Sequence, residues 1–496
     1  MAKVRRKMLR KPDRWDWVLL AVCMMFYLLF PVMDGPVWCV DSAGYVTMHI
    51  TREPLYPTFL AMCRGIGRLC RADALLVTVI LQSMFAGAAA WFAGDTARKA
   101  GNGSRLLQAA AILCQFAVTL LCRFAANRGS AYTDSILTEG LGLSLFVFFS
   151  CHLFLYLWTG KGRYLCWTML FSFLLISLRK QMMITLLIMG IVFAWYELVR
   201  KRRVRWFVCL CGMICGVVFA GKLFDRCYQY AVRGVWMEHS GNSMGILCTL
   251  LYSSDAERDR GLFEDETIGM LYEEIMEQAD EQQILYPYAE PGWLSVAVHY
   301  ADSYDAIGYG IINPVVEGYI SENFHYSAEE AAMKYDEICG AMSRTLFRQK
   351  LQPLLRVYLY NTWRGFVNSV AKANHLLSIY AAVLYLLTGI GAGYLIVQRR
   401  RLNRQLLRWE EQPEEDALKC RELIGRIDRS LCFTFIVAVG IVINTLVVGM
   451  IIFTQPRYMI YGMGLFYTAC CMLVRDILAC FVTVQPSASL LRNPPI

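Results

Sequence analysis

Ten apolar runs, most of them about as long as a bilayer core is thick, constrain the fold of this 496-residue chain more than any other feature. A helix of about 20 apolar residues crosses the hydrocarbon core of a membrane. The evenly alternating segments of a membrane β-barrel are missing. The sequence therefore predicts an all-α polytopic membrane protein with about ten transmembrane helices. We expect these spans near Trp17–Met33, Ala74–Gly94, Leu106–Cys122, Ile136–Trp158, Tyr164–Leu178, Met182–Val199, Trp206–Phe224, Leu376–Val397, Leu431–Phe453 and Tyr458–Cys480.

The distribution of charge predicts the orientation of these spans. Hydrophobic residues make up 57% of the chain and charged residues only 18%, which argues against a disordered chain or an ordinary cytosolic enzyme. With the N-terminus in the cytoplasm, the inner tail and loops hold 26 Lys and Arg and the short outer loops hold 9. This asymmetry follows the positive-inside rule and predicts a multi-pass protein of the cell membrane. The net charge of +9 is thereby explained without a nucleic-acid partner.

The chain divides into three regions. Residues 1–224 hold seven spans and a first outer loop at 34–73. Residues 225–375, which we call the outer segment, contain no membrane-length apolar run. Residues 376–496 hold three spans and a basic cytoplasmic loop at 398–430.

The outer segment differs from the rest in composition. It carries 22 of the chain's 40 acidic residues against 11 Lys and Arg. Apolar residues at helical spacing predict amphipathic helices over Asp265–Gln282 and Ala328–Arg348. A connection of about 150 residues is more than a linker, so we expect a mostly helical extracytoplasmic unit that caps a cavity at membrane level.

The first outer loop contains two polar motifs, DSAGY (Asp41–Tyr45) and REPLYP (Arg52–Pro57). If Ser42–Thr51 is helical, Asp41 is a natural N-cap and three further side chains share one face of the helix. These three are Tyr45, His49 and Arg52. Each residue alone has an ordinary role, as a cap, a headgroup contact or an interfacial ring. Together they exceed what a turn needs, and a carboxylate beside a cation is suited to activating a hydroxyl and binding phosphate.

A second polar feature interrupts the apolar runs at Arg179 and Lys180. Charge at membrane depth is costly and usually faces a protein interior or a water-filled cavity. A short hairpin whose basic tip reaches the interface is an equally good interpretation.

Four stretches together resemble the GT-C glycosyltransferases that use polyprenyl-phosphate sugars, the group of protein mannosyltransferases and lipid A aminoarabinose transferases. Asp41, Tyr45 and REPLYP resemble the first outer loop of that group. The other three are LTEGLGLSL (Leu137–Leu145), LRKQ (Leu178–Gln181) and QPRYMIYGMGLFY (Gln455–Tyr467). The resemblance covers most of residues 15–200 and 430–480, and it does not include the outer segment.

The resemblance implies transfer of a sugar from a polyprenyl-phosphate donor to an extracytoplasmic glycan, glycolipid or protein, with inversion at the anomeric carbon. Asp41 is the expected base. Asp34 is the alternative, because many members of the group have two adjacent acids and this chain has Asp41 followed by Ser42. The expected donor-phosphate ligands are Arg52, Arg128, Lys180 and Arg457. The expected substrate contacts are Tyr45, His49 and Glu139.

The need for a metal stays open at this stage. Some members of the group use a divalent ion and others do not. The 19 cysteines show no spacing typical of a metal site, so no ligand set points to a metal or another cofactor.

Two other functions compete with the transferase. A transporter or flippase for lipid-linked saccharides would place charges near the midplane and often contain internal repeats. Here the charges gather at the outer ends of the spans and no repeat is visible. A non-catalytic membrane scaffold would explain the outer segment but not the motifs in the first outer loop.

Overall fold

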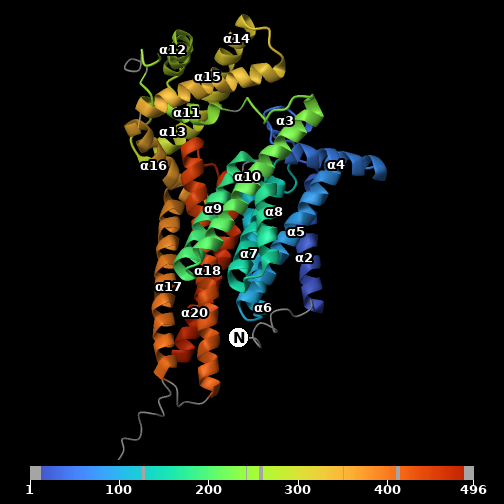
Figure 1. Cartoon of the computed structure of the whole chain (residues 1–496), viewed down its shortest axis with the longest axis vertical. Coiled ribbons are helices and arrows are strands. Elements are labelled where there is room, and N and C mark those ends of the chain that lie inside the picture. The colour runs from blue at the N-terminus through green and yellow to red at the C-terminus, as the bar shows by residue number, and fades with distance from the viewer. Residues whose placement is uncertain are drawn as a thin grey trace, which may run out of the picture.

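The computed structural model describes residues 13–125, 129–241, 243–255, 261–349, 351–408 and 414–484. These residues form helices joined by turns and loops, and the only β-type pairing among them is an isolated bridge between Val37 and Ser135. Figure 1 shows a bundle of long helices with a smaller group of helices at one end, which we call the outer end after the orientation expected from the sequence.

Nine helical segments within the described residues are long and apolar enough to cross a membrane, and the short α8 (Gly162–Leu178) adds a tenth apolar helix. The prediction of a polytopic all-α membrane protein is therefore confirmed. The nine segments are α2 (Arg14–Asp34), α5 (Ala74–Ala100), α6 (Arg105–Ala125), α7 (Glu139–Thr159), α9 (Ile184–Phe193) with its flanking turns η1 (Lys180–Met183) and η2 (Ala194–Arg200), α10 (Val204–Arg233), α17 (His375–Arg408), α18 (Glu414–Ile451), and α19 (Pro456–Met459) continued by η5 (Ile460–Gly462) and α20 (Met463–Val484).

Two expected boundaries differ from the structure. Helix α10 continues to Arg233, so the helix runs past the boundary expected at residue 224. The basic loop expected at 398–430 is largely helical, because α17 reaches Arg408 and α18 begins at Glu414. Arg, Leu, Gln and Glu are strong helix formers, and they extend both helices beyond the apolar run that crosses the membrane.

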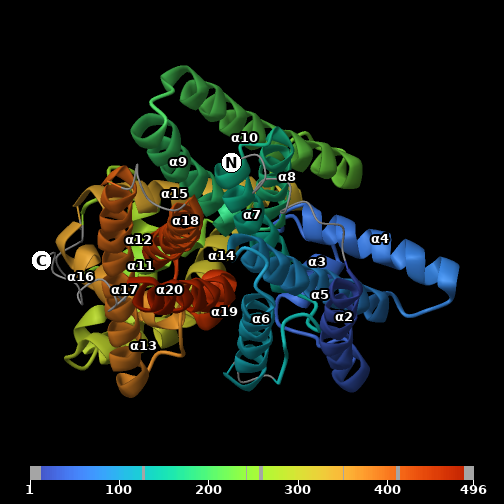
Figure 2. The same ribbon diagram turned by 90° about the horizontal axis from the view of Figure 1, so that it is seen from below.

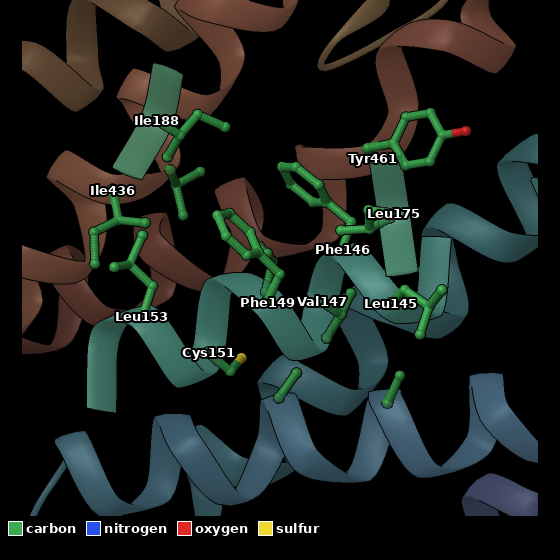
Figure 3. Packing of buried hydrophobic residues seen from close by; sticks show 14 of the residues in the cluster. Leu145, Phe146, Val147, Phe149, Cys151, Leu153, Leu175, Ile188, Ile436 and Tyr461 are labelled. Atoms are coloured by element: carbon green, nitrogen blue, oxygen red, sulfur yellow. The ribbon is translucent and has the colours of Figure 1, made fainter. Parts of the chain in front are cut away.

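Helix α7 lies at the centre of the bundle and is buried along almost its whole length. Figure 3 shows its side chains pointing in several directions, with Leu153 beside Ile436 and Phe146 beside Tyr461. The rings of Phe146 and Tyr461 have centroids 5.9 Å apart. Because protein covers this apolar helix on every side, its first residue, Glu139, also lies in the protein interior.

The first outer loop contributes two helices at the outer end. The short α3 (Ser42–Val46) is followed by α4 (Leu55–Cys70), which lies across the direction of the spans (Figure 1). One face of α4 buries Tyr56, Phe59, Leu60 and Cys63, while Leu69 on another face is exposed. Such a helix is typical of a membrane interface, as expected for this loop.

The outer segment forms its own apolar core above the spans. Its helices are α11 (Met244–Tyr252), α12 (Glu266–Glu281), η3 (Tyr286–Tyr288), α13 (Trp293–Asp305), η4 (Ala306–Ile312), α14 (Asn313–Asn323), α15 (Ala328–Gln349) and α16 (Leu351–Asn368). The two amphipathic helices predicted from the sequence, α12 and α15, are confirmed.

A buried amide fastens the outer segment to the spans. Asn361 of α16 donates hydrogen bonds to the carbonyl oxygens of Gly449 (2.8 Å) and Ile452 (2.9 Å). Its own Oδ1 accepts the backbone N–H of Thr454 at 2.9 Å. Because these bonds join α16 to the end of α18 and to the chain that links α18 and α19, they hold the outer segment in a defined position over the bundle.

Candidate functional site

The carboxylate of Asp41 lies between two guanidinium groups that come from distant parts of the chain. Its Oδ1 is 3.0 Å from Nη2 of Arg52, and its Oδ2 is 3.2 Å from Nη1 of Arg457. The three side chains are 21–24% exposed, so the cluster is half-buried but reachable from solvent. Arg52, expected on the face of a longer helix, and Arg457, expected at the start of a late span, are thus brought to one carboxylate.

The arginines control the ionisation of Asp41. Burial by itself raises the pKa of the Asp41 carboxyl, but the positive charges of Arg457 and Arg52 outweigh it, so this pKa lies below its ordinary value. Asp41 is therefore a carboxylate at neutral pH.

Local hydrogen bonds explain why the Asp41 carboxylate is free to pair with arginine. Asp41 occupies the N-cap position of α3 but makes no capping hydrogen bond with its side chain. Instead, Oγ of Ser42 accepts the N–H of Cys39 at 2.8 Å and donates to the carbonyl oxygen of Ile136 at 2.9 Å. These bonds fix the start of α3 against the loop before α7, which holds the carboxylate at a set place.

The expected helix over Ser42–Thr51 is shorter than predicted. Helix α3 ends at Val46, and Met48 adopts a left-handed backbone with φ of 57°. This turn leads the chain back so that Arg52 lies over Gly44, where a Cβ atom would be 2.7 Å from Nε of the arginine. The close approach of Arg52 to Gly44 depends on this turn, and the residue spacing in the sequence did not reveal it.

The turn also separates the side chains that the longer helix would have aligned. Tyr45 is buried below Arg52, whose Cζ is 4.8 Å from the centre of the tyrosine ring. His49 is exposed, and its Nδ1 is hydrogen-bonded to Oγ1 of Thr51 at 2.9 Å. The structure therefore places Tyr45 in the cluster and His49 outside it.

A tyrosine ring joins Arg457 to one further arginine, Arg179, on the other side of the cluster. The ring centre of Tyr458 is 4.7 Å from Cζ of Arg457 and 4.5 Å from Cζ of Arg179. Arg179, in turn, pairs with the buried carboxylate of Glu139 at 2.5 Å. Glu139 thus positions Arg179, and the cluster gains a third guanidinium.

Two buried donors of the cluster have no hydrogen-bond partner among the described residues. They are Nε of Arg52 and Nε of Arg457. A buried N–H without an acceptor costs free energy, and the two lie on the arginines that hold Asp41.

The alternative acid, Asp34, belongs to a different group of side chains. It pairs with Arg123 near the end of α6, with one hydrogen bond of 2.9 Å. Arg123 also lies 3.9 Å from the buried carboxylate of Asp134. This group ties the end of α2 to α6, and no contact joins Asp34 to the Asp41 cluster among the described residues.

Lys180, another expected cation, lies outside the cluster. Lys180 is exposed, and its backbone N–H donates to Oε1 of Glu53 at 2.6 Å. Arg128 lies outside the residues that the structure describes. The sequence analysis did not select Arg179 and Tyr458 as site residues, although both stand in motifs that it quoted. A guanidinium fits a phosphate better than an ammonium group does, and this difference favours Arg179 over Lys180.

In the part of the chain that the structure describes, no three His, Cys, Asp or Glu side chains lie close enough together to hold a metal ion. The site consists of the carboxylates of Asp41 and Glu139, three guanidiniums and the tyrosines that lie against them.

Neither a protein-family model, nor a curated protein, nor a solved structure matches this chain. The similarity to the GT-C group thus remains a resemblance of motifs.

Proposed function

We propose that this protein is an integral membrane glycosyltransferase that moves a sugar from a polyprenyl-phosphate donor to an acceptor at the outer end of the bundle. The observation that carries the proposal is the convergence of Asp41 with Arg52, Arg457 and Arg179 at the end of the spans. A lipid phosphate lies at this level when its chain is in the bilayer.

The arginines fit the charge that develops during transfer. When the bond between the anomeric carbon and the phosphate oxygen breaks, the leaving polyprenyl phosphate gains one negative charge. The side chains of Arg52 and Arg457 are accessible from solvent, and a guanidinium can bind phosphate through two parallel hydrogen bonds. Positive groups fixed at this place stabilise the leaving group without having to reorganise.

Asp41 serves two states of the site in this proposal. Without the donor, its carboxylate neutralises Arg52 and Arg457 and holds them in position. When the phosphate binds these arginines, the carboxylate becomes available to accept the proton of the acceptor hydroxyl as its oxygen attacks the anomeric carbon. A direct attack of this kind inverts the configuration at that carbon.

The test uses the full-length protein in a strain that lacks it. We expect Asp41→Asn to reduce sugar transfer to envelope glycans by about 10²- to 10⁴-fold, the usual contribution of a general base. The variant should still insert into the membrane and bind undecaprenyl phosphate. The matched control is Asp34→Asn, which should keep transfer.

Unchanged transfer by Asp41→Asn would contradict the proposed role of Asp41. Loss of transfer by Asp34→Asn alone would move the base to Asp34. If the wild-type protein neither binds undecaprenyl phosphate nor transfers a sugar, the glycosyltransferase proposal is wrong.

A further inference from the structure

Two polar side chains of the outer segment lie near the arginine cluster. The carboxylate of Asp305 interacts electrostatically with Arg457 and Asp41. The phenol of Tyr309 interacts with Asp41, Arg52 and Tyr458. Both residues therefore lie near the cluster, although nothing in the sequence marks them.

Packing fixes the position of these two residues. Tyr304, next to Asp305, places its ring 5.2 Å from that of Phe453, which lies four residues before Arg457. The hydroxyl of Tyr304 also donates to the carbonyl oxygen of Gly245 at 3.3 Å. The end of α13 is thus held against the chain that carries Arg457.

Asp305 and Tyr309 lie where an α-helix changes into a π-helical turn. Helix α13 ends at Asp305, and η4 covers Ala306–Ile312 before α14 resumes the α-helical pattern. The wide turn directs Ile307 and Ile311 into the core of the outer segment and leaves Tyr309 57% exposed. Single π-helical turns inside α-helices are frequent at functional sites, because the extra residue redirects side chains.

The two side chains also have unused capacity for binding. Asp305 is exposed and has no hydrogen bond or ion pair within the described part of the chain. Asp41, in contrast, is held by two arginines. Tyr309 and the side chains of the cluster are accessible from solvent.

We propose that Asp305 and Tyr309 bind the acceptor, and that this acceptor is a carbohydrate. The inference rests on the proposed glycosyltransferase function and assigns the second substrate. A free carboxylate accepts hydrogen bonds from two neighbouring hydroxyl groups, and an exposed tyrosine offers an apolar face with a polar tip. A sugar ring has hydroxyls at its edge and C–H groups on its face, so it matches this pair.

This arrangement places each substrate on its own side of the site. The arginines hold the lipid phosphate from the membrane side, and Asp305 and Tyr309 hold the acceptor from the outer segment. The acceptor hydroxyl then reaches the anomeric carbon beside Asp41. Asp305 and Tyr309 position the acceptor, and the proton still passes to Asp41.

The test compares Asp305→Asn and Tyr309→Ala with the wild-type protein in a strain that lacks the chain. We expect each variant to transfer at least about 10-fold less sugar to envelope glycan while the lipid-linked sugar accumulates. Binding of undecaprenyl phosphate to the purified variants should stay within about twofold of wild type. A factor of 10 corresponds to about 1.4 kcal/mol, which fits the loss of one hydrogen bond to a charged group.

Matched controls come from the same segment. Asp302→Asn removes an exposed carboxylate one turn earlier on α13, whose charge interacts with Arg364 instead of the cluster. Tyr326→Ala removes a tyrosine that is 43% exposed and stacks on Phe324. Both controls should transfer sugar like the wild type.

Three results would overturn the inference. Normal transfer by both variants would show that the acceptor binds elsewhere. A parallel loss of undecaprenyl phosphate binding would assign Asp305 and Tyr309 to the donor side. Sugar found on Ser or Thr of a protein would exclude the carbohydrate acceptor. A wild-type protein that does not bind undecaprenyl phosphate would instead remove the proposed function itself, and binding measured without acceptor separates this case from the others.

Discussion

Asp41 and Arg457 are 416 positions apart in the chain, yet Oδ2 of the aspartate lies 3.2 Å from Nη1 of the arginine. This ion pair joins the first outer loop to the start of the last span. It brings a carboxylate and a guanidinium, a group that can bind phosphate, to one place at the outer end of the bundle. The predictions below test how this place is built and held.

Gly44→Ala should weaken the binding of undecaprenyl phosphate about 10-fold without changing any charge. A Cβ at position 44 would lie 2.7 Å from Nε of Arg52, so the guanidinium has to move. The loss of one charge-assisted hydrogen bond is worth about 1.5–3 kcal/mol, which is at least this factor. Titration of the purified variant with the lipid measures the effect.

The control is Gly65→Ala on α4, where a Cβ would have no atom within 4 Å. Both substitutions change helix propensity in the same direction. Equal affinity of the two variants would show that the position of Arg52 does not matter for the lipid.

Glu139→Leu and Arg179→Leu should each lower the free energy of unfolding by about 3–5 kcal/mol, because each leaves an uncompensated charge in the interior. The double variant should cost clearly less than the sum, since no unpaired charge then remains. Denaturant unfolding of the detergent-solubilised protein gives the three values. The control is the same set of two single variants and one double variant at Lys334 and Glu337, an ion pair of the outer segment at 3.1 Å. The interaction energy between these two residues should be below about 1 kcal/mol. Additive losses at Glu139 and Arg179 would contradict the buried pair.

His239→Gln should cost more stability at acidic than at alkaline pH. The imidazole Nδ1 is 2.6 Å from Oδ2 of Asp225. Burial by itself lowers the pKa of His239, and the positive charge of Lys180 lowers it further. The hydrogen bond to Asp225 and the negative charge of Glu53 raise it by more, so the pKa of His239 is raised overall. The protonated pair therefore stabilises the fold fully below the unfolded pKa of about 6.5 and loses this effect as the pH rises through the folded pKa.

Thermal unfolding of wild type and His239→Gln at pH 5.5 and pH 8.5 measures this difference. The control is His325→Gln at an exposed position of the outer segment, which should have the same small effect at both pH values. A larger loss for His239→Gln at pH 8.5 than at pH 5.5 would contradict the raised pKa.

Asn361→Leu should lower the free energy of unfolding by about 2–4 kcal/mol. The substitution leaves the buried carbonyls of Gly449 and Ile452 and the N–H of Thr454 without their partner, and each unsatisfied group costs about 1–3 kcal/mol. Asn323→Leu removes an exposed amide that bonds only its own helix, and it should change stability by less than about 0.5 kcal/mol. Comparable losses for the two variants would show that Asn361 does not fasten the outer segment.

The sequence by itself determined the spans, because the match between an apolar run and the bilayer core is a local property of composition. It placed the start of α5 at Ala74 and the end of α8 at Leu178. It also identified α12 and α15, whose apolar residues repeat at helical spacing. Within the site, it selected Asp41, Arg52 and Arg457, each from a separate motif.

Only the tertiary structure decided which of these side chains meet. Arg179 and Lys180 are neighbours in one motif, but Arg179 turns toward Glu139 and Tyr458 while Lys180 faces solvent. Asp305 and Tyr309 belong to no motif, and they lie near the cluster because α13 packs against Phe453. A hydrophobic span is recognised by its own residues, whereas an ion pair across hundreds of positions exists only when the packing of whole helices brings its two ends together.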